Sequence, residues 1–452
     1  MAFWSSVDPL TLLFIVAFAL LGRVVLGAAP ALQALGLPQS LVGGALAFLA
    51  GPALLGWVPF DPHTLEAVVY HGLALVFIAF ALQPVTPAPL PGGARSIAFA
   101  IPWLTAAQGV LGLVVVLLWP GGLHPGFGMM LPLGFSQGPG QALSMGKAWE
   151  SMGMTDGSQI GLAVAAMGFV ACSLGGVLLV AVARRRGWLA PAAGDEATVA
   201  VSLPAPPGPG ELDRLAQQLG LCAVVYLGVY AALTALSRAL AGQPQLAAMV
   251  WGFHFLLGLA LAVALRFTLR RAGRSAVTDP AILDRVGGSV VDLSATAAIA
   301  AISLQALRAH WAPILVLSVA CTVFTLFACV WLARRTFDEH PFAHALTLYG
   351  TMTGTLPTGL ALLRAADPAL AGPVPRHMLA GVAASLVPSL PLLLVLLPMP
   401  VLGWPESHPG ASLRTIGGLL VYLLVVGALW RRLSPFRLLR PIGALWPDRP
   451  AP

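Results

Sequence analysis

Apolar runs long enough to cross a lipid bilayer recur along almost the whole chain, and they restrict its fold more than any other feature. A transmembrane helix needs about 20 apolar residues to cross a hydrocarbon core of about 30 Å. Only 9% of the residues are charged, whereas a soluble domain has about 25%. The sequence therefore predicts an all-α polytopic membrane protein with eleven transmembrane helices. The expected spans are 10–27, 41–56, 68–84, 97–119, 157–183, 218–241, 246–266, 285–307, 312–333, 376–402 and 411–432.

Two further segments, near 128–150 and 341–366, are interrupted at their middle by glycine, proline and small polar residues. If each is a re-entrant hairpin that enters and leaves by one side, 20 of the 24 basic residues fall on the same face of the membrane. Basic residues in short loops favour the cytoplasm. The amino terminus is therefore expected outside and the carboxyl terminus in the cytoplasm. The four basic residues left outside are Lys147, Arg238, Arg308 and Arg414.

Five spans and a hairpin are followed by five more spans and a second hairpin, which predicts two repeats of opposite orientation. PQSLVGG, from Pro38, and PQLAAMVWG, from Pro244, begin matching spans. AFALQ, which ends at Gln83, closes the next span of the first half, 68–84. AISLQ, which ends at Gln305, closes the corresponding span of the second half, 285–307. The predicted organisation is a first repeat at 1–185, a proline-rich cytoplasmic linker at 186–214, a second repeat at 215–403, and an additional helix with a basic tail at 404–452.

The two interrupted segments are the candidate binding site. Broken segments at matching positions of inverted repeats point to the site of a secondary transporter, because irregular backbone at membrane depth persists only where it faces protein or a water-filled cavity. The hairpins enter from opposite sides, so their tips are expected to meet near the midplane. A simple packing kink is the alternative for each segment. The candidate residues are Ser136, Gln137, Gly138, Gly140 and Gln141 in the first tip, and Thr351, Thr353, Gly354, Thr355, Pro357 and Thr358 in the second.

Two charged residues are candidates for the same site. Asp292 is expected about one turn into its span, where a carboxylate could ligate sodium or carry a proton. Its alternative role is a pair with Arg285, or hydration at the cytoplasmic mouth. Arg364, seven residues after Pro357, could hold a substrate carboxylate or extend to the cytoplasmic surface instead.

Several other function classes lack support in the sequence. It contains no Walker motif and no CxxC pair, so ATP-driven pumping and structural zinc are not indicated. The chain is not expected to be an enzyme or to carry an organic cofactor. Its net charge of +7 arises from short loops, which suits membrane topology better than nucleic-acid binding. His71 and His254 are expected to be buried structural histidines rather than proton relays.

The chain resembles the sodium/glutamate symporter family from about residue 10 to residue 400. The resemblance is carried by LPQSLVGG, FSQGPGQALSMGK, DGSQIGLAVAAMGFVACSLGG, the LDR before residue 286, and TGTLPTGLALLRA. It implies a bacterial inner-membrane carrier with two inverted five-span repeats, which moves acidic amino acids with sodium as a homodimer. Three positions depart from the family pattern: only two glycines, Gly138 and Gly140, remain of its first glycine signature, Met352 replaces a small residue, and Asp292 replaces an uncharged amide.

These observations predict an ion-coupled secondary transporter of glutamate or a related small carboxylate, with sodium as the expected coupling ion. Its partners would be the substrate, the lipid bilayer and a second copy of the chain, and not nucleic acid. One alternative is a proton-coupled organic-acid carrier of the same fold. Another is a channel or uniporter, which could not accumulate a solute against its gradient. An intramembrane enzyme using Asp292 with a histidine is a third, and nothing in the spacing brings those residues together.

Overall fold

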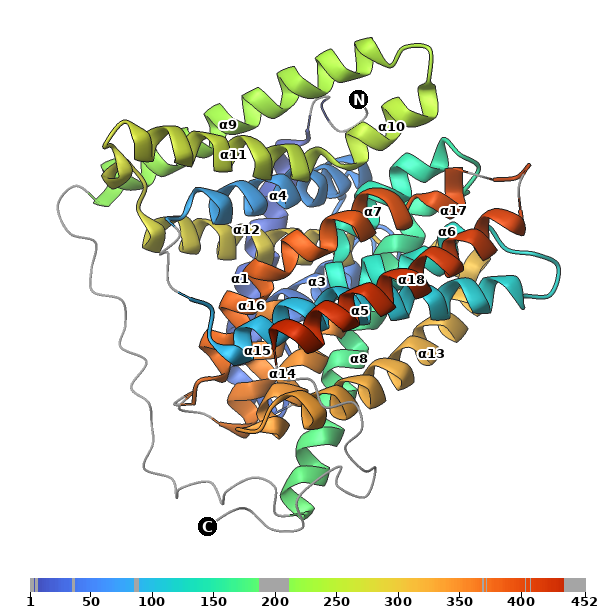
Figure 1. Ribbon diagram of the computed structural model, residues 1–452. Coiled ribbons are helices and arrows are strands. Elements are labelled where there is room, and N and C mark those ends of the chain that lie inside the picture. The colour runs from blue at the N-terminus through green and yellow to red at the C-terminus, as the bar shows by residue number, and fades with distance from the viewer. Residues whose placement is uncertain are drawn as a thin grey trace.

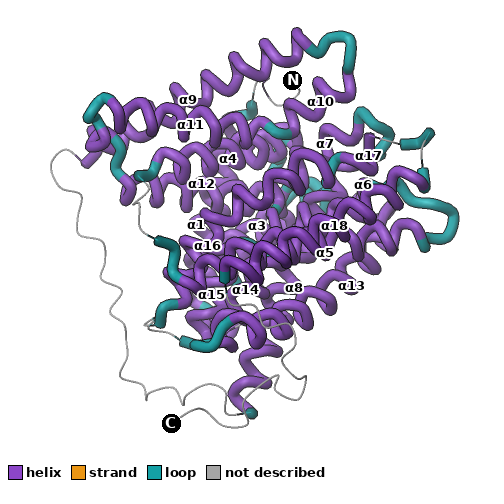
Figure 2. Tube along the Cα trace, in the orientation of Figure 1, coloured by secondary structure: helices purple, strands orange, loops and turns teal. Residues whose placement is uncertain are grey.

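The computed structural model describes residues 4, 7–34, 37–84, 89–186, 211–367, 370, 372–402, 404–406 and 408–434. All the regular structure in these ranges is helical (Figure 2). Eight helices are long and apolar enough to cross a membrane, and a ninth span results if the bent pair α10 and α11 is counted as one. The prediction of a polytopic all-α membrane protein is therefore confirmed. Residues 187–210 of the expected linker and most of the basic tail lie outside the described residues.

The membrane-length helices coincide with nine of the eleven predicted spans. They are α1 (Pro9–Ala28), α4 (Pro62–Leu82), α5 (Gly92–Leu117), α8 (Gly157–Arg185), α9 (Glu211–Ala239), α10 (Pro244–Gly252) with α11 (His254–Arg271), α13 (Leu304–Thr336), α16 (Val374–Pro391) with η4 (Leu392–Leu396) and α17 (Met399–Leu402), and α18 (Gly410–Leu433). Two predicted spans are helical but are too short or too charged to count as membrane-length helices. They are α3 (Gln39–Ala50), which has only 12 residues, and α12 (Pro280–Ala300), which carries Asp284, Arg285 and Asp292.

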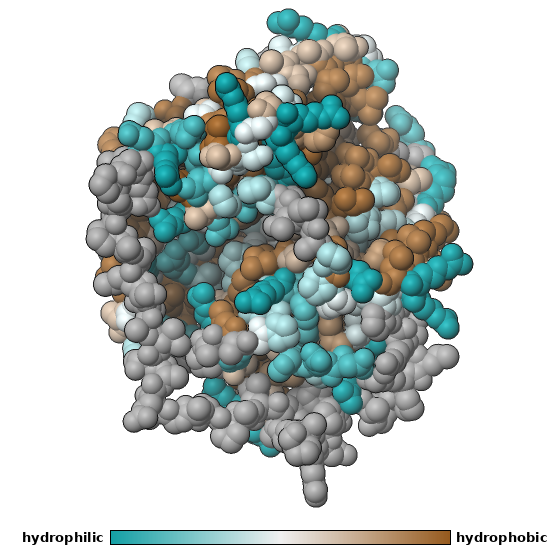
Figure 3. Space-filling view, turned by 60° about the vertical axis from the view of Figure 1, so that its left-hand side comes forward, coloured by the Kyte–Doolittle hydropathy of each residue, from teal (hydrophilic) through white to brown (hydrophobic). Residues whose placement is uncertain are grey.

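Most of the long helices lie side by side across the view of Figure 1, so that their ends gather at two opposite faces. In Figure 3 the left-hand side of that view is turned forward, and it presents hydrophilic side chains near its centre and hydrophobic ones towards the right. Large apolar side chains such as Leu13, Val224 and Leu424 are exposed. An exposed apolar belt between polar faces is the surface that a bilayer requires.

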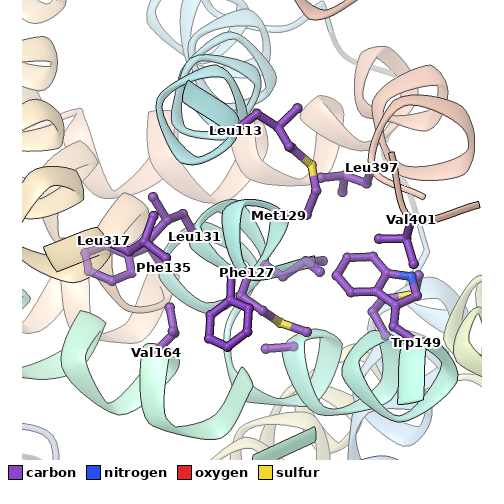
Figure 4. Packing of buried hydrophobic residues seen from close by; sticks show 14 of the residues in the cluster. Leu113, Phe127, Met129, Leu131, Phe135, Trp149, Val164, Leu317, Leu397 and Val401 are labelled. Carbon is purple, nitrogen blue, oxygen red and sulfur yellow. The ribbon is translucent and has the colours of Figure 1, made fainter. Parts of the chain in front are cut away.

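The helices form two packed groups. In the first, α4 contacts α11 and α12, and α3 contacts α1 and α12. In the second, α5 contacts α16 and α18, and α8 contacts α7 (Pro139–Glu150) and α13. The larger apolar cores lie in the second group. Figure 4 shows part of one, with Phe135 near Leu131 and Leu317, and with Trp149 near Val401. The interrupted segments therefore lie within the second group, against its largest core.

The amino ends of α1 and α4 are joined by a reciprocal set of hydrogen bonds. Each helix begins with the motif Asp-Pro-x-Thr, at Asp8–Thr11 and at Asp61–Thr64. Each aspartate accepts from the threonine of its own motif and caps its own helix. The backbone N–H of Asp8 donates to Thr64 Oγ1 (2.8 Å), and that of Asp61 donates to Thr11 Oγ1 (2.9 Å). Both helices therefore begin at the same face of the molecule.

This junction bears on the short helix α3, which lies between α1 and α4 in the chain. Since α1 and α4 start at one face, the chain must return across the molecule between them, and α3 is the helix that makes this return. It packs closely on α1: a Cβ atom added at Gly22 would lie 2.5 Å from the carbonyl oxygen of Gln39, and one at Gly43 would lie 2.5 Å from that of Phe18. Small residues allow such close helix crossings in membranes. The return passage agrees with the predicted span at 41–56, although its helix is shorter.

We expect Asp61→Ala to lower the free energy of unfolding by about 1 kcal/mol, the usual cost of a lost helix cap. The hydrogen bond from the Thr64 hydroxyl lowers the pKa of Asp61 below its ordinary value of 3.8, although burial raises it. The charged form is therefore stabilised by folding, and its contribution is present above pH 3.8 and is lost as the pH falls through the lower folded-state pKa. Thermal unfolding of the detergent-solubilised protein between pH 6 and pH 3 measures this effect.

Asp61→Asn is the matched control, because asparagine caps a helix without titrating in this range. The wild-type protein should be more stable than Asp61→Asn at pH 6, and the difference should shrink as the pH falls towards 3. A constant difference over the whole range would mean that the charge of Asp61 does not contribute.

Candidate functional site

The first interrupted segment is a pair of helical limbs separated by Gly138. The incoming limb is α6 (Gly126–Leu131) followed by η2 (Pro132–Gln137), and the outgoing limb is α7. Gly138 has φ +89° and ψ 176°, a backbone conformation that is almost restricted to glycine. Pro139, which cannot donate a backbone hydrogen bond, occupies the first position of α7. The break is thus fixed by two adjacent residues of special geometry.

The second segment has the same arrangement, with a break at Gly354 and Thr355. Its limbs are α14 (Pro341–Thr353) and α15 (Leu356–Ala366), and they pack closely, since a Cβ atom at Gly350 would lie 2.7 Å from the Cα atom of Gly359. The backbone N–H of Thr355 donates to Thr358 Oγ1 (2.7 Å), and this hydroxyl faces the carbonyl of Gly350. Thr358 therefore stabilises the break by providing hydrogen-bond partners for backbone groups on both of its sides.

The two breaks lie against each other. A Cβ atom built at Gly138 would be 3.4 Å from Thr355 Cγ2. A Cβ atom at Gly168 of α8 would be 2.5 Å from the carbonyl oxygen of Thr353 and 3.4 Å from the ring of Phe135. Residues more than 200 positions apart in the sequence thus meet on the surface of one helix.

A column of glycines along α8 makes this meeting possible. One end of α8 packs on the outgoing limb of the first segment and the other end packs on the second segment, and at each point a Cβ atom added to the glycine would clash with its neighbour. The close approaches are Gly157 to Gly146, Gly161 to Ala142, Gly168 to Thr353, Gly175 to Tyr349 and Gly176 to Leu362. The side of α8 that carries these glycines is therefore the common support of both segments.

Polar residues of α5 complete the surroundings of the two breaks, and sequence reasoning did not find them. Gln108 Nε2 donates to the carbonyl oxygen of Met352 (3.1 Å) and to Thr325 Oγ1 of α13 (3.0 Å). Its Oε1 atom is buried without a hydrogen-bond partner among the described residues. Thr105 Oγ1 lies 3.0 Å from the hydroxyl of Ser136. The only signal in the sequence is one amide and one hydroxyl three residues apart in an apolar span, which is too common to single out.

We expect Gln108→Leu to destabilise the second break, because it removes both hydrogen bonds and leaves the Met352 carbonyl buried without them. An unsatisfied buried acceptor costs about 1–3 kcal/mol, and thermal unfolding should show a loss of this size. Gln33→Leu is the control, since Gln33 donates to the carbonyls of Leu26 and Gly27 at an exposed position, and its loss should cost much less. Equal losses for the two variants would contradict a special role of Gln108.

The predicted residues of the first tip differ in their surroundings. Ser136 and Gln137 are half-buried, and Ser136 Oγ donates to the carbonyl oxygen of Pro132 (2.8 Å). Gly140 packs against Leu73 of α4. Gln141 is 3% exposed, and its Oε1 atom has no partner among the described residues. The structure thus brings all five residues to the break, with Gln141 carrying an unused buried acceptor.

In the second tip, several hydroxyls are occupied by the helix itself. Thr351 and Thr353 donate to the carbonyls of Thr347 and Tyr349, each 2.8 Å away and four residues earlier in α14. Pro357 is exposed and Thr355 is half-buried. The hydroxyl oxygens keep a lone pair for a cation, but their hydrogen atoms are not directed at a solute.

The structure does not bring Asp292 and Arg364 to the tips. Asp292 lies twelve residues beyond Pro280, about three turns into α12, because the helix begins earlier than expected; the expected position one turn from its start is wrong. Asp292 Oδ2 accepts from Gln39 Nε2 at the start of α3 (2.5 Å). Arg364 is exposed in the last turn of α15. Asp292 therefore joins α12 to α3, and Arg364 occupies a surface position.

Of the two histidines expected to be buried, His254 is buried and His71 is half-buried. His254 is fully buried, stacks on Tyr70 with a ring separation of 3.7 Å, and shares a hydrogen bond of 2.8 Å with the Tyr70 carbonyl. His71 Nδ1 lies 2.5 Å from the Tyr226 hydroxyl.

Comparison of the chain with known protein families, with curated proteins and with solved structures gave no match.

Proposed function

We propose that the chain is a secondary transporter built from two inverted repeats, in which each interrupted segment is a re-entrant hairpin. The solute is a small carboxylate such as glutamate, and a cation, sodium in the first instance, binds with it between the two tips. One observation carries the proposal: Gly138 lies against Thr355, and next to these two breaks Phe135 and Thr353 both pack on Gly168 of α8. The resemblance to sodium/glutamate symporters agrees with this assignment and adds a bacterial inner membrane and a homodimer as expectations.

The helix contacts support the repeat. If α1, α3, α4, α5 and α8 of the first half correspond to α9, α11, α12, α13 and α16 of the second, then contacts between the halves should occur in exchanged pairs. They do: α3 packs on α12 while α11 packs on α4, and α5 packs on α16 while α13 packs on α8. A two-fold relation between the halves requires contacts in such exchanged pairs, whereas a chain without internal symmetry would not be expected to have them.

The position of the tips along α8 supports a site near the midplane. Gly168 lies eleven residues beyond Gly157, the first residue of α8, which corresponds to about 17 Å of helix. Half of a hydrocarbon core of about 30 Å is about 15 Å. Irregular backbone at this depth is costly unless protein groups, a water-filled cavity or a ligand satisfy its polar groups.

The direction of the helices favours an anion together with a cation. α7 and α15 both begin at the tips, and a helix N-terminus carries a partial positive charge that favours a carboxylate. η2 and α14 both end there, and carbonyls at a helix C-terminus favour a cation. A carboxylate bound with a small cation satisfies both sets of backbone groups, and this is the physical basis for coupling the two.

Uptake into proteoliposomes tests the function. We expect radiolabelled glutamate to accumulate above its external concentration when an inward sodium gradient is imposed, and to equilibrate without one. Accumulation driven by a pH gradient without sodium would favour the proton-coupled carrier, and equilibration under every gradient would favour a channel or uniporter. A panel of other small carboxylates in the same assay defines the substrate.

Thiol labelling tests the re-entrant topology separately. The four native cysteines are buried, so single cysteines introduced beside the segments report their sidedness with little background. Gly122→Cys and Ser151→Cys flank the first segment, and both should react with an impermeant reagent added outside cells. Glu339→Cys and Asp367→Cys flank the second, and both should react only after the cytoplasmic side is opened. Reaction of the two flanks of one segment from opposite sides would overturn the proposal.

A further inference from the structure

A polar cavity of about 410 Å³ lies at the open end of the first segment, where α7 turns into α8 beside the start of α4. Its volume is within the range of small-molecule sites, about 300–1,000 Å³. It does not include the residues of either tip. Most of its lining is charged or polar, and the side chains that matter are Glu66, Lys147, Glu150, Asp156, Ser158 and Gln159.

These side chains hold one another in place. Lys147 Nζ lies 2.9 Å from Glu150 Oε2, and Glu150 Oε1 accepts from the backbone N–H and the hydroxyl of Ser158. Gln159 Nε2 donates to Glu66 Oε1 (2.6 Å), and Gln159 Oε1 accepts from the backbone N–H of Ser303 (2.7 Å). The groups that line the cavity are therefore oriented by hydrogen bonds before any ligand arrives, which lowers the entropic cost of binding.

The charges of the cavity do not balance. It contains three carboxylates, of Glu66, Glu150 and Asp156, and one ammonium group, of Lys147. Asp156 Oδ2 lies within hydrogen-bond distance of His310 Nε2 (3.2 Å), and Glu150 forms an ion pair with Lys147. Glu66 accepts from the neutral amide of Gln159 and shares the positive charge of Lys147 with Glu150. The cavity thus carries more carboxylates than cationic groups, and its half-exposed ammonium group uses one of its three donors on Glu150.

We propose that this cavity binds an α-amino acid as its zwitterion, before the solute reaches the tips. The ammonium group of the solute pairs with Glu66, and its carboxylate pairs with Lys147. Both contacts join opposite charges in a partly desolvated site, where such hydrogen bonds are strongest. This inference rests on the proposed function and narrows its substrate class, because a carboxylate without an ammonium group adds negative charge to a cavity whose carboxylates already outnumber its cationic groups.

The cavity and the first tip lie at opposite ends of one helix, α7. Lys147 and Pro139 are both on α7, eight residues apart, which corresponds to about 12 Å of helix. A solute held at Lys147 is therefore separate from one bound at Gly138, and the two positions can be probed independently.

Thr155→Cys in the full-length, detergent-solubilised protein provides the test. Thr155 lines the cavity and is exposed, whereas Ser151 is exposed in the same loop between α7 and α8 without lining it, so Ser151→Cys is the matched control. We expect glutamate to slow maleimide labelling of Cys at position 155 at least fivefold and to leave position 151 unchanged. Glutarate, which has the same chain length without the ammonium group, should protect position 155 at least tenfold less well.

Two second-site variants assign the contacts. Adding Glu66→Gln should raise the glutamate concentration for half-maximal protection at least tenfold and change that for glutarate less than twofold, while Lys147→Gln should weaken both. Equal protection by glutamate and glutarate, protection by sodium chloride alone, or no protection by either acid would overturn the proposal. The labelling needs no transport, so its failure leaves gradient-driven uptake intact, whereas loss of uptake with protection preserved would count against the transport function alone.

Discussion

Gly138→Ala is expected to reduce gradient-driven uptake at least a hundredfold while the protein remains folded. The residue adopts φ +89° and ψ 176°, a region in which a Cβ atom costs about 1–3 kcal/mol. An alanine would relieve this strain by rotating the backbone between η2 and α7. Because Gly138 lies against Thr355, such a rotation would also displace the contact between the two tips. Uptake of glutamate into proteoliposomes measures the loss, and size-exclusion chromatography shows whether the variant is folded.

Gly122→Ala is the matched control for this variant. Gly122 has φ +80°, and a Cβ atom there would have no neighbour within 4 Å. Alanine should introduce comparable backbone strain in the loop between α5 and α6, and reduce thermal stability to a similar extent, without changing uptake. If both variants lost uptake equally, strain alone would explain the effect and the position of Gly138 at the tip would not matter.

The sequence predicted the class of fold well because the bilayer imposes simple rules of length and polarity. Nine of the predicted spans correspond to helices of membrane length. The exceptions have identifiable causes. α3 ends at Ala50, before the GP pair at Gly51 and Pro52, whereas hydropathy alone carried the span to residue 56. α12 begins at Pro280, capped by Asp279, and this cap signal lies outside the apolar run, so Asp292 was placed too near the start of its helix.

The candidate site was predicted only where backbone breaks mark it. Glycine and proline at 138–140 and at 354–357 signal a break directly, and both breaks occur where they were expected. Their neighbours could not be predicted in this way. Gln108 approaches Met352 across 244 residues of sequence, and Glu66 approaches Gln159 across 93. Such contacts depend on how α4, α5 and α8 pack, and hydropathy contains no information about which face of each helix meets which neighbour.

Gly168→Ala is expected to lower stability by about 1–2 kcal/mol and to reduce uptake at least tenfold. In an unobstructed helix, alanine is more stable than glycine by up to about 1 kcal/mol. At Gly168, however, the added Cβ atom would lie 2.5 Å from the carbonyl oxygen of Thr353, and forced overpacking costs about 1–3 kcal/mol. A backbone carbonyl cannot rotate away as a side chain can, so α14 must shift and carry the second tip with it. Thermal unfolding and proteoliposome uptake measure the two effects.

The sign of the stability change distinguishes this mechanism from a general intolerance of glycine substitution. Gly417 lies in α18 with no atom within 4 Å of an added Cβ, so Gly417→Ala should leave stability unchanged or raise it, and should not affect uptake. If Gly168→Ala were stabilising as well, the close contact between α8 and the second break could not exist as described. The two tips would then lack their common support on α8, and a shared solute site between them would lose its structural basis.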